Sequence, residues 1–260
     1  MPSKNKRSTD PSDYQDLPQA IAAISKSYQD GFVIPAHEHR RDQLLYATHG
    51  IMRLRTARAA WIVPRDSAVY IPSGTTHSIS MHSNVDMRSL YIDSGAISKT
   101  PRGLTVLAVS SLFRELILAL IDEPVDYNSD SRGHSIAKMI EWEIGRAPEL
   151  SLNYPLPSDP RLQRLCAGLL ANPADRRTLE DWSEVAGAST RTLARLFDRE
   201  LGMSFNRWRQ RVRFHNALEA LARGEAVASV AHQHGYQSPS AFSAAFAKVM
   251  GQSPSKGFAN

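Results

Sequence analysis

The chain has one cysteine in 260 residues, Cys166. A single cysteine excludes a disulfide within the chain, which is typical of proteins of the reducing cytoplasm, where we expect this one to act. Cys166 lies among Leu165, Leu169 and Leu170, an apolar run with helical spacing. We therefore expect a buried structural thiol rather than a nucleophile, and we predict no catalytic residue in the chain.

Long apolar runs are also missing, so no segment is expected to span a membrane. The first ten residues are polar and basic and lack the apolar core of a secretory signal. Residues 1–15 are expected to form a disordered tail. The hydrophobic content of 42% is that of a globular protein, and the length leaves room for two domains of ordinary size.

The excess of basic residues is confined to one part of the chain. Residues 158–260 hold 14 Lys and Arg against nine Asp and Glu, whereas residues 1–157 hold 17 of each class. The whole net charge of +5 therefore lies in the C-terminal part. A local basic excess favours binding to a nucleic acid, because neutralising phosphates provides much of the affinity of such proteins.

That same part carries one sequence phrase twice, about 49 residues apart. Each copy has a helical run, a Gly followed by a short turn, a Ser near a new helix start, and apolar residues at helical spacing. This order is typical of a helix-turn-helix, and two in tandem predict a protein that reads two successive major-groove segments of duplex DNA. The matched positions are Leu193, Phe197 and Gly202 in the first copy and Phe242, Phe246 and Gly251 in the second.

The N-terminal part has the pattern of a β domain followed by helices. Short runs of residues with the pattern of β-strands, separated by turns with Gly, Pro and Asn, favour a small barrel or a jelly roll. Apolar residues at helical spacing then predict two helices after about Ser110. The expected strands cover residues 43–47, 51–56, 59–63, 68–71 and 87–92, and the two helical stripes are Leu112-Phe113-Leu116-Leu120 and Ile136-Met139-Ile140-Ile144.

Residues 158–258 resemble the DNA-binding domain of the AraC/XylS family of transcriptional regulators. The motifs that carry the resemblance are Leu193-Ala194-Arg195-Leu196-Phe197, Gly202-Met203-Ser204, Trp208-Arg209-Gln210-Arg211-Val212-Arg213, Gly235-Tyr236-Gln237-Ser238-Pro239-Ser240-Ala241-Phe242 and Pro254. The resemblance lies nearest to the NimR-like branch of the family. It implies a ligand-responsive transcription factor that is usually dimeric.

Residues 30–92 are similar to the cupin-type sensor domain that precedes the DNA-binding domain in many such regulators. The phrases that carry the similarity are Pro35-Ala36-His37-Glu38-His39, Leu44-Leu45-Tyr46 and Ile71-Pro72-Ser73-Gly74-Thr75-Thr76-His77. The expected fold is therefore α+β in two domains, an N-terminal cupin-like β-barrel with helices and a C-terminal all-α double helix-turn-helix. We place the sensor and dimerisation domain at 16–150, a proline-rich linker at 151–157 and the DNA-binding domain at 158–260.

The candidate DNA-binding residues lie on the two expected recognition helices and on the helix that links them. Arg195, four residues after Arg191, can donate to O6 and N7 of guanine. The second helix presents hydroxyls and an amide, which favour contact with little discrimination between bases. Arg209 and Arg211 of the linking helix are expected to contact phosphates, unless they are only solvated or ion-paired. The full set is Thr190, Arg191, Arg195, Arg209, Arg211, Gln237, Ser238, Ser240 and Ser243.

Four polar residues of the β domain resemble a cupin metal site: His37, His39, Gln43 and His77. His37 and His39 are two apart, so on a strand they share a face, and Gln43 returns to that face. Imidazoles suit one divalent transition metal such as Zn, Ni, Fe or Cu, whereas Gln43 in place of the acidic ligand weakens the site. The alternatives are an organic-effector pocket without metal and a barrel lining without function.

The sequence thus predicts a regulator that binds promoter DNA, forms a homodimer and is controlled by a small molecule or a metal in the β domain. Two rival hypotheses remain. One is a cupin metalloenzyme fused to an accessory DNA-binding domain, and the other is an architectural DNA-binding protein with a structural barrel. The amide of Gln43 argues against the enzyme, and so does the lack of a further acid or base beside the three histidines.

Overall fold

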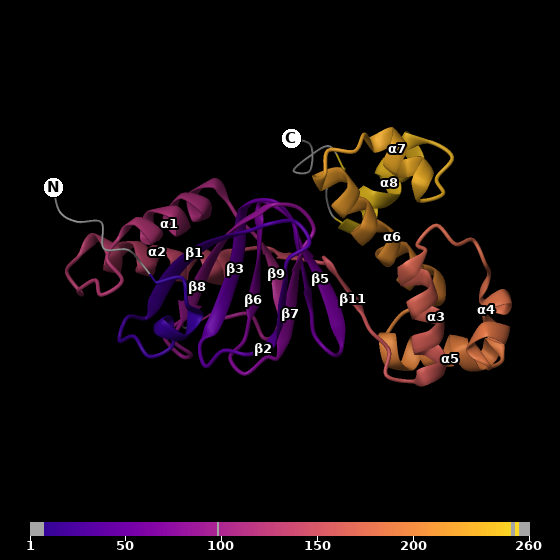
Figure 1. The fold of residues 1–260 in the computed structure, drawn as a ribbon, viewed down its shortest axis with the longest axis horizontal. Coiled ribbons are helices and arrows are strands. Elements are labelled where there is room, and N and C mark those ends of the chain that lie inside the picture. The colour runs from indigo at the N-terminus through magenta and orange to yellow at the C-terminus, as the bar shows by residue number, and fades with distance from the viewer. Residues whose placement is uncertain (1–7, 98, 251–252, 255–260) are drawn as a thin grey trace. The chain divides into compact units, whose positions relative to one another are not determined.

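The structure, a computed structural model, describes residues 8–97, 99–250 and 253–254 (Figure 1). The chain forms two compact units, each assembled from two segments. The first unit comprises Met1–Met52 and Val63–Leu150, and the second comprises Arg53–Ile62 and Ser151–Asn260. Residues 53–62, which the sequence placed in the β domain, are therefore grouped with the C-terminal helices.

The first unit is built on an antiparallel six-stranded sheet with the strand order β1-β8-β3-β6-β9-β10. Every residue of β6 is buried, as are the first six residues of β3. Both faces of these strands are covered, so their sequences lack the alternation of a half-buried strand. The strands are β1 (Ile21–Tyr28), β3 (Asp42–His49), β6 (Ser67–Ile71), β8 (Val85–Ile92), β9 (Thr105–Ala108) and β10 (Glu149–Leu150).

A second sheet contains β2 (Val33–His37), β4 (Met52–Arg55), β5 (Ala59–Val63), β7 (His77–Met81) and β11 (Asn153–Pro155). In the first unit β2 pairs antiparallel with β7, and the register shifts between Ile34 and His37. In the second unit β11 pairs antiparallel with β5. Strand β7 alternates between buried and half-buried residues, which turns His77 inward at its first position.

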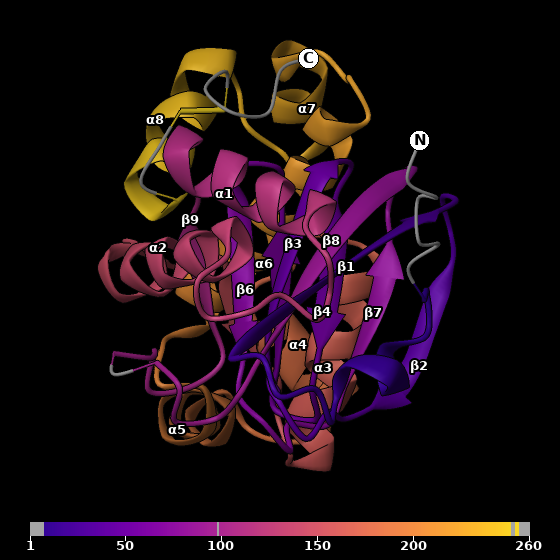
Figure 2. The same ribbon diagram turned by 90° about the vertical axis from the view of Figure 1, so that its left-hand side faces the viewer.

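Helices α1 (Ser111–Asp122) and α2 (Arg132–Arg146) cover one face of the six-stranded sheet (Figure 2). Both helices begin at a serine cap. The Ser110 hydroxyl accepts a hydrogen bond from the Phe113 amide, and the Ser131 hydroxyl accepts one from the His134 amide. Each cap satisfies an amide that has no partner within its helix, which stabilises the helix by about 1 kcal/mol.

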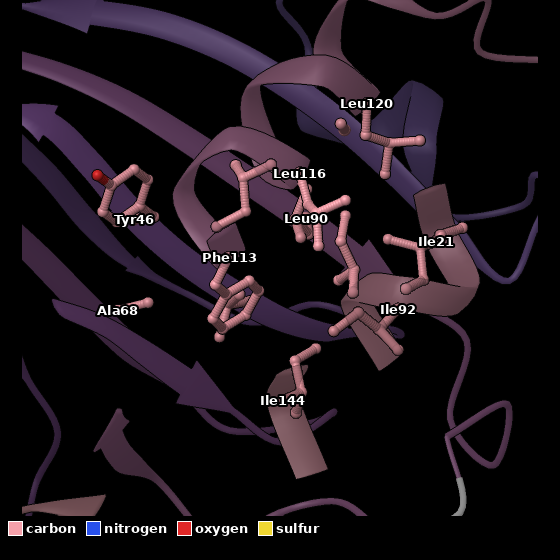
Figure 3. Close-up of a cluster of buried hydrophobic side chains, with 14 of the residues drawn as sticks. Ile21, Tyr46, Ala68, Leu90, Ile92, Phe113, Leu116, Leu120 and Ile144 are labelled. Atoms are coloured by element: carbon pink, nitrogen blue, oxygen red, sulfur yellow. The ribbon is translucent and has the colours of Figure 1, made fainter. Parts of the chain in front are cut away.

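The core of the first unit lies between these helices and the sheet (Figure 3). Phe113 and Leu116 of α1 pack in one cluster with Leu90 and Ile92 of β8 and with Ile144 of α2. Burial of each such side chain stabilises the fold by about 1.5–3 kcal/mol relative to exposure. The core thus fixes α1 and α2 on the sheet.

Two residues of the predicted helical stripes face solvent instead. Leu112 is 51% exposed and Met139 is 46% exposed. A helix that packs on a sheet buries only a narrow stripe of its surface. Leu112 and Met139 each precede a buried residue, Phe113 or Ile140, and one residue along a helix turns the side chain away from the sheet. The spacing therefore predicted both helices correctly, but these two positions lie outside the buried stripe.

The second unit contains the six helices of the C-terminal part. Helix α6 runs between a group formed by α3, α4 and α5 and a pair formed by α7 and α8 (Figure 1). The predicted fold class, α+β with a β-rich N-terminal part and a C-terminal helical part, is confirmed, and the strands form two sheets. The helices are α3 (Pro160–Ala171), α4 (Leu179–Ala186), α5 (Thr190–Leu201), α6 (Phe205–Ala222), α7 (Val227–Gln233) and α8 (Pro239–Met250).

Two segments expected to be irregular carry regular structure. Of the predicted tail 1–15, residues 1–7 lie outside the described part, but Pro11–Tyr14 form a 3-10 helix, η1, and Tyr14 is buried. The predicted linker 151–157 contains β11, whose Tyr154 is also buried. A buried aromatic side chain supplies the apolar area that holds each short segment in place.

No helix in the described ranges has the length and the apolar character needed to cross a membrane.

Candidate nucleic-acid interface and candidate metal centre

Helices α4 and α5 form the first predicted helix-turn-helix. Helix α4 ends at Gly187, whose φ of 67° is a left-handed conformation that favours glycine. The Gly187 and Ala188 amides donate back to the carbonyls of Glu184 and Ser183. The Ser189 hydroxyl then accepts from the amide of Thr192 and starts α5.

Helices α7 and α8 repeat this arrangement with one extra residue in the turn. Gly235 has a φ of 80°, and the Gly235 and Tyr236 amides donate to carbonyls of α7. Ser238 starts α8, because its hydroxyl accepts from the Ala241 amide. The offset between copies is therefore 48 residues at the glycine and 49 residues along the second helix. Gly251, the last matched position, lies outside the described residues.

Helix α5 separates apolar from polar residues as the sequence predicts. Leu193, Leu196 and Phe197 are at most 1% exposed, so they hold the helix against the core. The outer face of the helix consists of exposed residues, namely Thr190, Arg191, Ala194, Arg195 and Asp198. Within the described part of the chain, neither Arg191 nor Arg195 has an ion pair, so both guanidinium groups are available to a ligand.

Helix α8 presents a face without cationic side chains at the predicted positions. Gln237 and Ser240 are exposed, whereas Ser238 and Ser243 are half-buried. The hydroxyl of Ser238 is already used as the helix cap. A hydroxyl that caps a helix can still donate its own hydrogen, so it can contact a phosphate but discriminates poorly between bases.

Three arginines of α6 have partners within the second unit. Arg209 donates to the Arg177 carbonyl at 2.9 Å, and Arg211 donates to the Asn153 carbonyl at 3.1 Å. Arg213 donates to the carbonyls of the loop that precedes α4, at 2.7 and 2.9 Å. These contacts fasten α6 to its neighbours. For Arg209 and Arg211 they are an observed structural role beside the predicted contact with phosphate.

A buried polar cluster that the sequence did not reveal lies against α6. Arg53 forms an ion pair with Glu219, and their side chains are 22% and 7% exposed. His215 is 1% exposed, and its ring meets Tyr154 edge-on at a centroid distance of 4.8 Å. Neither nitrogen of His215 has a hydrogen-bond partner within the described residues. Burial, and then the charges of Arg53 and Arg211, lower the pKa of His215 to about 3.

The three predicted metal-site histidines come together in the first unit. His37 is the last residue of β2, His39 follows in the loop to β3, and His77 is the first residue of β7. Their ligand nitrogens all lie within 4.8 Å of one another. The predicted geometry was wrong in one respect, because His37 and His39 do not share one strand. The group forms instead where β2 ends and β7 begins.

Hydrogen bonds orient two of these rings. His37 Nδ1 lies 2.8 Å from the Pro35 carbonyl, and His77 Nδ1 lies 2.8 Å from the Thr75 carbonyl. A carbonyl only accepts, so each Nδ1 carries the proton and each Nε2 keeps a free lone pair. His77 is 1% exposed, and its Nε2 has no hydrogen-bond partner within the described residues. Metal-binding histidines are oriented in this way by backbone carbonyls, so the residues fit a divalent cation.

Two of these histidines, His39 and His77, favour their neutral form. Burial, and then the nearby His37 and His77, lower the pKa of His39 to about 4. Burial also lowers the pKa of His77, against the effect of its bond to Thr75. Since a cation needs the neutral ring, these two ligands stay available below the ordinary pKa of about 6.5.

Gln43, the fourth predicted ligand, lies on β3 and is 2% exposed. Its Nε2 donates to the Ser89 hydroxyl at 3.1 Å, whereas its Oε1 has no partner within the described residues. An unpaired buried amide oxygen is costly, so this atom calls for a donor or a cation.

A cavity of about 550 Å³ opens beside this group. His37, His39 and Gln43 line it, together with Tyr91 and Met87 of β8. Its size is in the range of sites for small organic molecules, and its wall is partly apolar. The first unit therefore joins a candidate metal centre to a space for an organic ligand.

Two family models match the chain. The model described as "AraC-like ligand binding domain" matches residues 18–205, and the model described as "Helix-turn-helix domain" matches residues 182–259. The first of these covers more than half of the chain.

The HTH-type transcriptional regulator NimR of Escherichia coli (strain K12) is 32% identical over 237 residues, which are 91% of this chain and 86% of that protein. The HTH-type transcriptional activator RhaR of Klebsiella pneumoniae subsp. pneumoniae is 24% identical and covers 91% of this chain and 90% of its own. The crystal structure of ToxT from Vibrio cholerae O395 aligns with 91% of this chain and 96% of that chain, at 12% identity and a TM-score of 0.38. From the family models and the likeness to NimR, the chain belongs to the AraC family of DNA-binding transcriptional regulators and carries an AraC-like ligand-binding domain.

Proposed function

We propose that this AraC-family regulator reads a promoter through both helix-turn-helix units and that a metal or a small molecule in the first unit controls it. DNA recognition is supported by the exposed face of α5. This face presents Arg191 and Arg195, which have no ion pair among the described residues, on a helix held in place by three buried apolar residues. The observation that carries the second half is the cavity that adjoins three histidines.

Recognition by α5 follows from its geometry. A helix of this kind fits the major groove and presents its outer side chains to base edges. Arg195, at the middle of the exposed face, is the candidate for a two-pronged contact with guanine, and Arg191 lies one turn nearer the start of the helix. Thr190 stands at the first helical position, where hydroxyls and amides contact phosphate.

Arg195→Ala is expected to weaken binding to the operator by roughly 1–3 kcal/mol and to relax the preference at one base pair. Binding to random DNA should change much less, because a base contact contributes little there. Gel-shift titrations on a selected operator and on random duplex measure both quantities. Equal losses on the two DNAs would show that Arg195 only contacts phosphate.

The test should use the full chain rather than a fragment that starts at residue 158. Trp208 Nε1 donates to the Pro155 carbonyl at 2.8 Å, and Arg211 donates to the Asn153 carbonyl. A cut at residue 158 removes both partners and uncovers the side of α6 that they cover. Loss of DNA binding by such a fragment would then report on folding instead of recognition.

Control by the first unit requires a difference in ligand affinity. A ligand shifts the DNA-binding equilibrium only by as much as its affinities for the competent and incompetent states differ. His37, His39 and His77 would hold a divalent cation, which would supply a local positive charge and coordinate a ligand in the cavity. Gel shifts with and without added Zn²⁺ or Ni²⁺, on protein first treated with chelator, test this. If neither metal and no member of a library of small molecules changes the DNA affinity, the architectural hypothesis is favoured.

The rival hypothesis of a metalloenzyme is less well supported. The matched relatives are named transcriptional regulators, and we propose that this chain is not an enzyme. Glu38, the acidic residue nearest in sequence to the histidines, is exposed, and its carboxylate accepts from the Thr76 hydroxyl at 3.0 Å. A turnover screen on metal-loaded protein discriminates the two hypotheses.

A homodimer is supported by exposed apolar side chains on α1 and α2. Trp142 is 72% exposed, and Met139, three residues earlier, lies on the same side of α2. Large exposed apolar residues that lie together mark interaction surfaces, and Trp is frequent among the residues that dominate binding.

Trp142→Glu is therefore expected to weaken self-association by roughly 2 kcal/mol, about thirtyfold in Kd. Val185→Glu is the matched control, because Val185 is an exposed apolar residue of α4, outside this surface. Sedimentation equilibrium at several protein concentrations measures the effect. The same monomer–dimer balance in both variants would place the dimer contact elsewhere.

A further inference from the structure

The candidate metal centre supplies no negative charge. Its three histidines are neutral ligands, and no carboxylate or thiolate belongs to the ligand group found among the described residues. Gln43, the polar residue beside them, is also neutral. A divalent cation bound here would therefore keep its full charge of two beside His77 and Gln43, which are buried, and beside His37 and His39, which are half-buried.

The charged residues around the cavity do not neutralise the charge of such a cation. Lys26 and Arg40 line it, but so do Asp10 and Glu38, so their charges cancel. The two carboxylates are engaged: Asp10 accepts from the amide and the hydroxyl of Ser12, and Glu38 accepts from Thr76. A charge that leaves water needs a partner of opposite sign, and here the chain does not provide one.

A negative charge is thus one property that the ligand of this cavity needs, and Gln43 indicates a second, a hydrogen-bond donor. Its Oε1 is buried and has no donor among the residues that the structure describes, while Ser89, which is fully buried, accepts from its Nε2. A molecule in the cavity that carries a hydroxyl would satisfy this oxygen. The cavity also offers an apolar wall, formed by Ile34, Ile79 and Met87, against which a short carbon chain can pack.

We infer that the ligand of this cavity is a small hydroxycarboxylate, whose carboxylate neutralises the metal bound by the three histidines and whose hydroxyl donates to Gln43 Oε1. This inference rests on the proposed metal site. No bond is made or broken; the acid and the metal bind together because each lowers the cost of burying the other. The metal and the acid are thus coupled ligands, and neither is expected to bind tightly alone.

The test uses Co²⁺ as the metal and glycolate as the acid, on the full chain, with acetate as the acid that lacks a hydroxyl. Titration calorimetry gives Co²⁺ affinity, and the visible absorption of bound Co²⁺ reports its ligands. Glycolate is expected to tighten Co²⁺ binding by roughly tenfold or more and to change the spectrum, with acetate giving a smaller effect.

Two variants at one position separate charge from hydrogen bonding. Gln43→Glu supplies the missing carboxylate, so Co²⁺ should bind tightly without any acid and glycolate should add little. Gln43→Leu keeps the charge deficit and removes the acceptor, so acetate and glycolate should become equivalent. Thermal unfolding shows whether each variant is folded. If a variant is not folded, the wild-type titrations with Co²⁺ alone, with glycolate and with acetate still test the inference.

Each outcome bears on one of the two proposals. Co²⁺ that binds the wild-type chain equally well with and without glycolate overturns this inference and leaves the metal site in place. Absence of Co²⁺ binding under all conditions overturns the metal site and, with it, this inference. A glycolate effect that persists unchanged in Gln43→Glu contradicts the role assigned to Gln43.

Discussion

Replacing His37 and His39 by alanine in one chain is expected to abolish loading of a divalent transition metal. The change removes two of the three imidazoles whose ligand nitrogens lie within 4.8 Å of one another, and it leaves His77 alone. One imidazole does not hold such a metal against water and buffer, whereas three do. DNA binding itself should persist, because these residues belong to the first unit and the helix-turn-helix units belong to the second.

Elemental analysis after incubation with Zn²⁺, Ni²⁺, Fe²⁺ and Cu²⁺ measures the effect, on protein purified without a chelator or an affinity tag. The expected values are about one metal per wild-type chain and close to none for the variant. His49→Ala is the control, since His49 is an exposed histidine at the end of β3. Substoichiometric metal on the wild-type chain with all four ions would leave the cavity as a site for an organic ligand alone.

The helix-turn-helix units could be predicted from the sequence because their signals are local. The caps Ser189 and Ser238 and the left-handed Gly187 and Gly235 all act within a few residues of the turn they define. Because the phrase occurs twice, the same cap and turn signals are present in both units, which strengthens the prediction. Local hydrogen bonding and apolar spacing were sufficient here because short helices depend on both.

The three histidines of the candidate metal centre were selected by residue type, but the way the fold brings them together could not be predicted. The sequence suggested that His37 and His39 share a strand face, whereas β2 ends at His37 and His39 lies in the following loop. What brings His77 to them is the pairing of β2 with β7, where His37 stands opposite His77. Such a pairing joins residues 40 apart, and no local pattern encodes it.

Six strands of the described residues escaped prediction, namely β1, β2, β7, β9, β10 and β11, and three of them show why. Strand β1 reads Ile21-Ala22-Ala23-Ile24 at its start, which lacks alternation because all four residues are buried. Strand β11 contains a proline and is only three residues long. Strand β7 does alternate, so an apolar residue at every second position could have revealed it.

The buried cluster at α6 shows the same limit most clearly. Arg53 and Glu219 are 166 residues apart in sequence, and neither stands in a motif. A buried ion pair depends on the removal of both side chains from water, which is a property of the packed structure alone. His215 stands in no motif either, and it lies in this core with no hydrogen-bond partner for its ring nitrogens in the described part of the chain.

Glu219→Gln is expected to lower the free energy of unfolding of the second unit by roughly 3 kcal/mol. The change leaves the Arg53 guanidinium, 22% exposed, without its carboxylate, and an uncompensated buried charge costs several kcal/mol. Acid should act in the same direction. His215 stays neutral in the fold down to a pKa of about 3 but takes up a proton when unfolded below about 6.5, so stability falls as the pH drops through that window.

Urea unfolding of the full chain, followed by tryptophan fluorescence, measures the loss, since Trp182 and Trp208 lie in the core of the second unit. Glu225→Gln is the matched control: its pair with Arg223 is 3.4 Å long, and the Arg223 and Glu225 side chains are 46% and 32% exposed, so we expect a loss of at most about 1 kcal/mol. Arg53→Met with Glu219→Leu removes both charges and should restore most of the stability. If Glu219→Gln costs no more than the control, the pair is too well hydrated to hold α6, and the fastening of α6 rests on Arg209, Arg211 and Trp208 instead.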